Sequence, residues 1–302
     1  MKTVFVAGAT GYLGRQIVKH YMERGWDVRA LVRNASAAHK SRLKATSLVE
    51  AEATNPDSLT DLMAGVDLVI SALGITRQRD NLSYWDVDYQ ANVNLLSEAL
   101  RAGVKHFAYV HVLNARAMKG VPMVDAKEAF AEKLKASPIK STIVCPSGFF
   151  SDMADFYSMS KAGRAWLFGD GTKKLNPIDG ADLAVALAKA IDLDKDHIEI
   201  GGPHTFTQRE IAELAFAVQF KPAKIIYLPD VFRRIAIWVL PWTTSRHIHG
   251  PALMFLTAMG MDMVGERHGE KPLFDYFERL ANGEPTRVND TNNSLAELKN
   301  AG

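Results

Sequence analysis

The sequence predicts an α/β protein of the Rossmann type, a doubly wound parallel sheet followed by a smaller mixed C-terminal lobe. A glycine-rich turn at residues 8–14 lies between a short apolar run and an amphipathic run, in the order strand, turn, helix. Short apolar runs then alternate with helical patterns as far as residue 150, which is typical of parallel βαβ units. Ligands of such sheets bind at the carboxyl ends of the strands.

The composition is that of an ordinary globular protein. The chain has 302 residues, 47% of them apolar and 23% charged, enough for a large α/β domain with a small lobe. A net charge of +2 gives no reason to expect a nucleic-acid partner. The single Cys145 excludes an internal disulfide and favours a reducing, cytoplasmic location. We expect no cleavable signal peptide, no metal site and no transmembrane segment, since no uncharged apolar run reaches ~18 residues.

The turn GATGYLG is expected to hold the phosphates of a dinucleotide. Gly8 permits the tight turn, Gly11 lets the backbone approach a pyrophosphate, and Gly14 allows close packing of helix on sheet. Free N–H groups and the dipole at a helix N-terminus attract the anion. A purely structural glycine turn is the alternative. The expected contacts are Gly8, Thr10, Gly11, Tyr12, Leu13 and Gly14. The GxxGxxG spacing resembles that of the short-chain dehydrogenase/reductase superfamily.

The residue at the end of the second strand, expected over residues 26–33, indicates whether the cofactor is NAD or NADP. An acid about 20 residues beyond the turn would bond the ribose 2′-hydroxyl of NAD, whereas an Arg there pairs with the 2′-phosphate of NADP. The strand ends in Arg33, with Ser36, Lys40 and Arg42 close behind. NADP(H) is therefore favoured. NAD(H) is the alternative, with Arg33 stacked on the adenine or capping the sheet edge.

Two further segments match the superfamily's adenosine site. Residues 49–59 resemble its strand-end pattern in which an Asp faces the adenine, and Glu52 stands in that place. After the fourth strand, the loop 71–74 is similar to the one that passes under the adenine ribose, which implies contacts from Ala72, Leu73 and Gly74. Arg77 and Arg79 in the next loop either help to hold phosphate or are surface residues.

The remaining elements follow from periodicity and turn residues. Strands are expected over residues 48–53, 66–72, 104–112, 139–145, 197–201 and 223–228, and helices over 56–64, 84–102, 126–136, 180–191 and 208–218. Residues 168–178 are expected to form a hairpin around an Asp-Gly turn. Residues 229–282 read as mostly helical, with a polar tail after residue 283. The expected domains are 1–150, with 176–200 returning to it, and 151–302 as a substrate or partner lobe.

The motifs GATGYLG, SALG, DVDYQANVNLL and CPSGFF together resemble the atypical short-chain reductases related to NmrA, and NPIDGADLA also fits this group. The resemblance is clearest over residues 1 to about 150 and ends near residue 215. It implies a Rossmann fold that binds NAD(P)H. Such proteins include quinone or enone reductases and also cofactor-binding proteins that regulate or assist assembly without known catalysis.

The resemblance also implies a catalytic set, which this chain lacks in part. Ordinary members reduce a carbonyl with Ser, Tyr and Lys, the Tyr giving a proton while hydride leaves the nicotinamide. The matching helix reads Met123-Val-Asp-Ala-Lys127, so the Lys is present and the Tyr is absent. The Ser is missing as well, and Asp88 stands where an Asn is usual. Lys127 can still bond the nicotinamide ribose; an ordinary solvated Lys is the alternative.

His111 is the candidate for the missing proton donor. It lies at the carboxyl end of the fifth strand, on the face shared with Tyr109 and Phe107. An imidazole titrating at about 6.5 can donate a proton at neutral pH. The alternative is a strand-end His that bonds a backbone carbonyl.

The next strand end is expected beside the nicotinamide. There the backbone of Pro146 to Gly148 can bond the carboxamide, and Phe149 either walls the pocket or packs in the core. Cys145 is expected to be a buried strand residue.

Two late segments, residues 231–242 and 251–264, are unusually apolar and rich in Met and Trp. They suit a lid over an apolar substrate, a dimer face, a peripheral membrane contact or packing within the lobe. The sequence therefore predicts an NADP(H)-dependent reductase of the atypical short-chain type, acting on a small apolar quinone, enone or carbonyl. The alternative is a non-catalytic NAD(P)-binding redox sensor or assembly protein that meets a protein partner through its C-terminal lobe.

Overall fold

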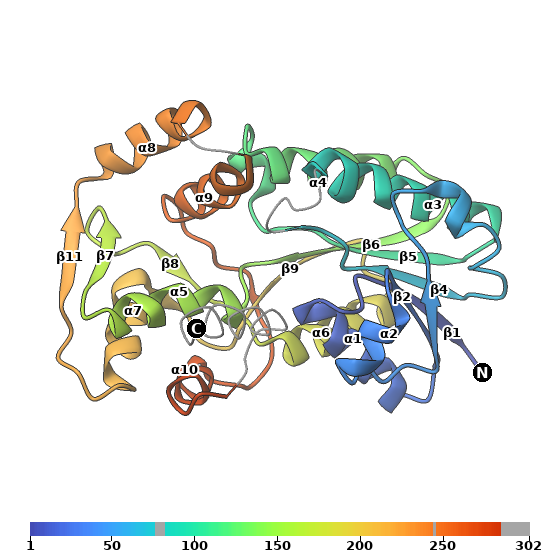
Figure 1. The fold of residues 1–302 in the computed structure, drawn as a ribbon, viewed down its shortest axis with the longest axis horizontal. Helices are drawn as coiled ribbons and strands as arrows, with labels where there is room; N and C mark the ends of the chain where they lie inside the picture. The colour runs from blue at the N-terminus through green and yellow to red at the C-terminus, as the bar shows by residue number, and fades with distance from the viewer. Residues whose placement is uncertain (76–81, 244–245, 285–302) are drawn as a thin grey trace, which may run out of the picture.

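An eight-stranded sheet forms the centre of the computed structural model, which describes residues 1–75, 82–243 and 246–284 (Figure 1). Every strand pairing in this sheet is parallel. The order is β12-β9-β6-β5-β4-β1-β2-β3, so the direction of winding reverses between β1 and β4. The predicted Rossmann-type sheet is thus confirmed. Its strands are β1 (Thr3–Ala7), β2 (Asp27–Val32), β3 (Ser47–Glu50), β4 (Leu68–Ser71), β5 (His106–Val110), β6 (Lys140–Pro146), β9 (His197–Gly201) and β12 (Glu266–Arg267).

Helices cover both faces of the sheet, and its central strands β1, β4, β5 and β6 are largely buried. Along β1, Val4 and Val6 belong to one buried cluster, whereas Phe5 and Ala7 belong to the other. Below the sheet in Figure 1 lie α1 (Tyr12–Glu23), α2 (Ala35–Lys40) and α6 (Gly180–Asp192), and above it α3 (Asn92–Arg101) and α4 (Pro122–Lys135).

The glycine turn lets α1 pack against β1 without a gap. Gly8 has φ +79°, a left-handed conformation that favours glycine. A Cβ on Gly14 would lie 2.0 Å from the carbonyl oxygen of Gly8, so no side chain fits there. A Cβ on Gly11 would meet only that same oxygen, at 3.3 Å. Two of the three glycines are therefore needed for the fold, whereas a Cβ at the third would make one tight contact that a shift of a few tenths of an ångström relieves.

Two expected helices are wound differently from an α-helix. Residues 56–64 contain only a short 3₁₀ turn, η1 (Pro56–Leu59). Residues 84–102 begin as a π-helical stretch, η2 (Trp85–Ala91), which continues into α3. The buried side chain of Asn92 donates to the carbonyl oxygens of Val87 and Asp88 (3.3 and 2.9 Å), and its own oxygen accepts from Ser71 Oγ (2.5 Å). This tie fixes the π-helical turn at the end of β4.

Beyond residue 150 a lobe forms around a core of its own. The expected hairpin over residues 168–178 is wrong, because the strands on either side of its turn pair with different partners: β7 (Ala165–Phe168) in parallel with β11 (Ile225–Leu228), and β8 (Lys174–Leu175) with β10 (Phe206–Thr207). The lobe's helical segments are η4 (Phe150–Met153), α5 (Ala154–Lys161), α7 (Gln208–Ala217), α8 (Asp230–Thr243), α9 (Arg246–Ala258) and α10 (Leu273–Ala281). None of the helices within the described ranges is both long and apolar enough to cross a membrane.

The chain returns from this lobe to the sheet twice. β9 lies beside β6, as the return of residues 176–200 requires, and β12 then adds the edge strand. The fully buried Asn176 links the two returning segments. Its Nδ2 donates to the Gly265 carbonyl oxygen and its Oδ1 accepts from the Gly265 N–H, both at 2.9 Å. The division into two domains near residue 150 stays a prediction.

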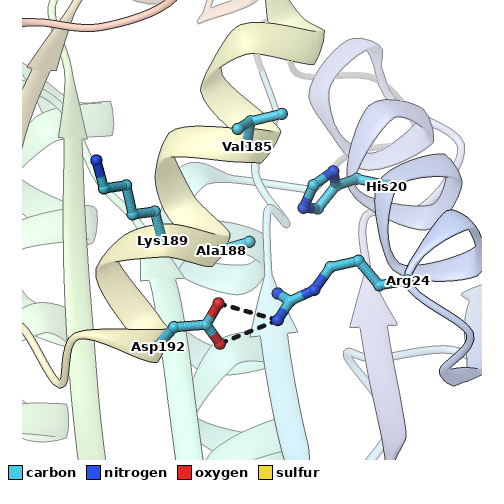
Figure 2. Close-up of a pocket in the computed structure, with 6 residues that line it drawn as sticks. All are labelled: His20, Arg24, Val185, Ala188, Lys189 and Asp192. Atoms are coloured by element: carbon cyan, nitrogen blue, oxygen red, sulfur yellow. Dashed lines mark hydrogen bonds and ion pairs between the residues drawn. The ribbon is translucent and has the colours of Figure 1, made fainter.

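A shallow groove of about 310 Å³ lies between α1 and α6 (Figure 2). It is at the ends of these helices remote from the glycine turn. Arg24 of α1 donates to both carboxylate oxygens of Asp192 of α6 (3.1 and 2.9 Å), and His20, Val185 and Lys189 line the rest. The groove is therefore a junction that holds two helices together, away from the expected cofactor site.

Replacing Gly14 by Ala is expected to lower the free energy of unfolding by about 1–3 kcal/mol or more, because the new methyl group meets backbone that cannot move aside. Urea unfolding followed by circular dichroism measures this. Gly11→Ala is the matched control and should remain close to the unaltered protein. Equal unfolding midpoints for Gly14→Ala and the unaltered protein would contradict this account of the packing.

Candidate functional site

The first turn of α1 offers its N–H groups to an anion. The helix begins at Gly11, and in the described chain no side chain caps it and no acid lies in its first turn. Thr10 and Gly11 are exposed, whereas the side chain of Leu13 packs into the core and leaves only its backbone for binding. Uncapped N–H groups and the helix dipole fit the pyrophosphate of a nicotinamide dinucleotide.

Arg15 fixes the shape of this turn, although the sequence reasoning missed it. Its Nε donates to the Thr10 carbonyl oxygen (3.1 Å), and its terminal nitrogens donate to the carbonyl oxygen and hydroxyl of Ser41 (2.9 and 2.7 Å). The turn is thereby tied to the segment that follows α2. The only signal in the sequence was an Arg directly after the last glycine of the motif.

Arg33 and Glu52 lie at the ends of two adjacent strands, β2 and β3. The N–H of Ala51 donates to the carbonyl oxygen of Val32 (3.0 Å), which keeps the two strand ends together. Arg33 is exposed, and the carboxylate of Glu52 accepts from the N–H and hydroxyl of Thr54 (3.4 and 3.1 Å). Their contact with adenosine stays a prediction. Arg77 and Arg79 lie outside the described residues.

Three chain segments converge on Lys127 at the carboxyl ends of β4 and β5. Its Nζ lies 3.2 Å from Asp88 Oδ1, 3.4 Å from the Val110 carbonyl oxygen and 5.4 Å from the centroid of the Tyr109 ring. A Cβ on Gly74 would lie 2.6 Å from Asp88 Oδ1 and 3.0 Å from Lys127 Nζ. The Lys127 side chain is only 14% exposed, so it is not the solvated helix residue that was the alternative.

Asp88 belongs to this cluster, although it was expected only as a departure from a family pattern. Its carboxylate is fully buried, and Oδ2 accepts from the Ile75 N–H (3.3 Å). Burial raises the pKa of Asp88, and the Lys127 ammonium opposes that rise. A buried carboxylate of this kind requires a cation, and Lys127 supplies it.

The loop after β4, residues 72–74, lies between the glycine turn and the cluster of Lys127 and Asp88. The Ala72 N–H donates to the Ala7 carbonyl oxygen (3.0 Å), and the Leu73 N–H donates to Ser71 Oγ (3.3 Å). A Cβ on Gly8 would lie 2.6 Å from the Ala72 carbonyl oxygen, so the loop lies directly against the glycine turn. The structure therefore brings the turn, the loop and Lys127 to one edge of the sheet.

The strand end CPSGFF meets the glycine turn through α6. The Ile178 N–H donates to the Gly148 carbonyl oxygen (2.9 Å), and the Tyr12 hydroxyl accepts from the Gly180 N–H (3.1 Å). The rings of Tyr12 and Phe149 pack edge to face, 5.8 Å between centroids. Pro146 is the last residue of β6, so the backbone of residues 146–149 lies at the carboxyl edge of the sheet, as predicted.

His111 does not fit the role of a cationic proton donor. Its ring is buried just past β5, stacks on Tyr109 and has Nε2 2.7 Å from Glu128 Oε2. Burial lowers the pKa of His111 to about 4, although the hydrogen bond with Glu128 opposes this. The ring is therefore neutral at pH 7, with Nε2–H donating to the carboxylate. Nδ1 is left as a buried acceptor that has no partner among the described residues.

The two phenols and the thiol described near this edge are not activated. Burial raises the pKa of the Tyr12 phenol and that of the Tyr109 phenol, so neither matches the Tyr of the superfamily's catalytic set. Burial also raises the pKa of the Cys145 thiol to about 12, which makes this cysteine inert, as expected.

Comparisons with known proteins agree with this arrangement. The family model described as the NmrA-like family matches residues 1–255. The chain is 29% identical over 251 residues to the photosystem II assembly factor Ycf39 of Guillardia theta, covering 80% of this chain and 79% of that protein. It is 30% identical over 262 residues to the chloroplastic divinyl chlorophyllide a 8-vinyl-reductase of Zea mays, covering 79% and 64%.

Solved structures share the fold. An NADPH-dependent quinone oxidoreductase of Escherichia coli, complexed with NADPH, superposes with a TM-score of 0.71 at 17% identity, covering 92% of this chain and 99% of that one. An isoflavone reductase superposes with a TM-score of 0.69 at 18% identity and the same coverage. At such identities the likeness concerns the fold alone.

The buried His111 makes stability depend on pH. Between about pH 6.5 and pH 4 the unfolded chain binds a proton that the folded protein excludes, so the free energy of unfolding falls as pH falls, by up to about 3 kcal/mol. His111→Gln should make this fall smaller, as measured by urea unfolding at pH 7, 5.5 and 4.5. His197→Gln, at a half-exposed position on β9, is the control. An unchanged pH dependence in His111→Gln would refute the assignment.

Proposed function

The chain belongs to the NmrA-like family, and from that premise we propose that it binds NADP(H) at the carboxyl edge of the sheet and reduces a small conjugated apolar acceptor, a quinone or an enone. The pyrophosphate would lie on the glycine turn, the 2′-phosphate near Arg33, and the nicotinamide between Lys127 and residues 146–149. Glu52 and the loop 72–74 would face the adenosine. When bound, the cofactor supplies the hydride.

The observation that carries this proposal is the cluster of Lys127, the buried Asp88 and the exposed Gly74 beside the uncapped helix. Lys127 has one contact with the Asp88 carboxylate and one with the Val110 carbonyl oxygen. An ammonium has three N–H donors, so one is left for a ribose hydroxyl. Held from two sides, this donor would orient the nicotinamide ribose without having to give up a proton.

The choice of acceptor follows from the missing proton donor of the superfamily's catalytic set. The Tyr and Ser of the superfamily are missing, and the His111 ring is neutral at pH 7. Hydride addition to an isolated ketone forms a localised alkoxide, which needs a positioned acid. Addition to a quinone or an enone forms a delocalised anion, which can take its proton from water. A conjugated acceptor therefore suits the residues of this edge better than a simple carbonyl.

A second candidate is a cofactor-binding protein that assists assembly or senses redox state, without turnover. Relatives named as photosystem II assembly factors support it. So does the outward face of α8, where the side chains of Trp238 and Trp242 are 75% and 82% exposed and leave apolar surface available to a partner. The cytoplasmic location stays a prediction, since the relatives include chloroplastic proteins.

Binding and turnover are best measured together. Isothermal titration with NADPH and with NADH gives the affinities, and stopped-flow oxidation of bound NADPH by quinones, enones and aldehydes gives the acceptor. Oxidation by quinones or enones, with aldehydes inert, is the expected result. Tight binding without oxidation by any acceptor would reject the reductase and favour the assembly protein.

Lys127→Met should weaken NADPH binding by roughly tenfold or more, because a charged hydrogen bond to the ribose is lost. Lys133→Met is the matched control, since Lys133 is exposed on the same helix. Isothermal titration measures both variants, and thermal unfolding shows whether they are folded. Unchanged affinity in a folded Lys127→Met would remove Lys127 from the cofactor site.

Arg33→Ala should weaken NADPH much more than NADH, since only NADPH carries the 2′-phosphate that an arginine pairs with. The dissociation constant for NADPH divided by that for NADH should therefore rise by roughly tenfold. Equal losses for the two cofactors would contradict the choice of NADP(H).

A further inference from the structure

The helix α8 carries apolar residues on two opposite sides. Its inner side packs on the lobe, where Ile237 and Leu240 contact the lobe core. Its outer side has Val231, Ile235, Trp238 and Trp242 at spacings of four, three and four residues, which places them in one row along the helix. These four side chains are 53%, 51%, 75% and 82% exposed. We call this row the outer stripe. A helix at the surface of a globular protein is normally polar on that side.

The charged residues of α8 lie beside the outer stripe and leave a net positive charge. The carboxylate of Asp230 is neutralised by two arginines, with Arg233 Nε at 2.6 Å and Arg234 Nε at 2.9 Å. Arg233 is buried and also donates to the Leu256 carbonyl oxygen (3.0 Å), whereas the side chain of Arg234 is 76% exposed. No unpaired acid therefore lies on this helix.

The two strands next to α8 do not continue the outer stripe. β11 leads directly into α8, and its partner β7 lies beside it at the edge of the lobe (Figure 1). Trp166 and Tyr227 are 45% and 44% exposed, but the parallel register pairs Trp166 with Ile226 and Leu167 with Tyr227, so the two rings lie on opposite faces of the pair. The exposed Arg164 and Lys224 precede the paired Ala165 and Ile225, so they lie at the end of the strands remote from α8. The row of exposed apolar residues is therefore that of α8 alone.

The charge of this region identifies the partner. α8 contains Arg233, Arg234 and one acid, Asp230, a net charge of +1, and the exposed Arg234 is its outward charge. A second copy would bring a like-charged helix against this one, which opposes self-association. An anionic lipid surface attracts it, and tryptophan rings favour the headgroup level of a bilayer. An amphipathic helix with aromatic and apolar residues on one side and arginine at its border lies in the plane of such a surface.

We propose that α8 docks on the surface of a bilayer that contains anionic lipid, with the outer stripe inserted at headgroup depth. The docking surface lies on the lobe, away from the glycine turn, and it does not depend on the proposed reductase activity. It would place the protein where apolar molecules dissolve.

The test is flotation of the full-length protein with phosphatidylcholine vesicles, with and without phosphatidylglycerol. Binding is expected with the anionic vesicles, accompanied by a blue shift of tryptophan emission, and should weaken by roughly tenfold or more in high salt or with pure phosphatidylcholine. The double variant Trp238→Ser/Trp242→Ser should lose binding by a similar factor. The control Val185→Ser/Leu193→Ser removes two apolar side chains of comparable exposure, 51% and 59%, from and just after α6, and should bind as the unaltered protein does.

Three results would overturn the proposal: no flotation with anionic vesicles, equal flotation of the tryptophan variant, or a dimer of the unaltered protein that this variant dissociates. The last would make a second copy the occupant. Circular dichroism and NADPH titration show that the variant is folded, because the stripe is outside the cofactor site. Vesicle binding and cofactor oxidation thus succeed or fail separately.

Discussion

The close approach of α1 to the glycine turn at Gly14 is the constraint on which the candidate site depends. Where the helix and the turn that follows β1 touch through backbone alone, the N-terminus of α1 is held over the carboxyl edge of the sheet. Arg15 then ties the turn to Ser41, and Tyr12 ties it to the start of α6. Since an anion at this N-terminus is held by N–H groups that belong to the fold itself, binding needs no charged side chain in the turn.

The Asp88–Lys127 pair gives this edge a different chemistry from that of a Ser-Tyr-Lys reductase. Lys127 is held by the Asp88 carboxylate and the Val110 carbonyl oxygen, an arrangement suited to holding a hydroxyl. The nearest phenol, that of Tyr109, lies under Lys127 and is itself made less acidic by burial. Under the proposed function, these residues position the cofactor and the proton comes from water.

Sequence alone predicted the sheet and the glycine turn well because both depend on local signals. Alternating apolar runs define parallel strands, and glycine spacing defines the turn. The π-helical stretch was not predicted, since it depends on the Asn92 side chain reaching back to Val87 and Asp88 and across to Ser71. The hairpin failed for a similar reason: an Asp-Gly turn predicts a reversal, whereas the partners of β7 and β8 come from residues 206–228. His111 was placed on the correct face, but its neutral state depends on burial, which no single residue in the sequence reveals.

The last strand of the sheet has a consequence for how the protein is made. β9 ends at residue 201, but β12, which pairs with its open edge, lies at residues 266–267. In the same way, the side chain of Asn176 accepts a hydrogen bond from the N–H of Gly265, which follows it by 89 residues. During synthesis the apolar sheet therefore has an unpaired edge until most of the lobe has emerged from the ribosome. The pairing of β12 with β9 joins residues that are far apart in the sequence, and such contacts form slowly. An unpaired strand edge is a site at which chains aggregate, so β9 is open to such pairing in that interval.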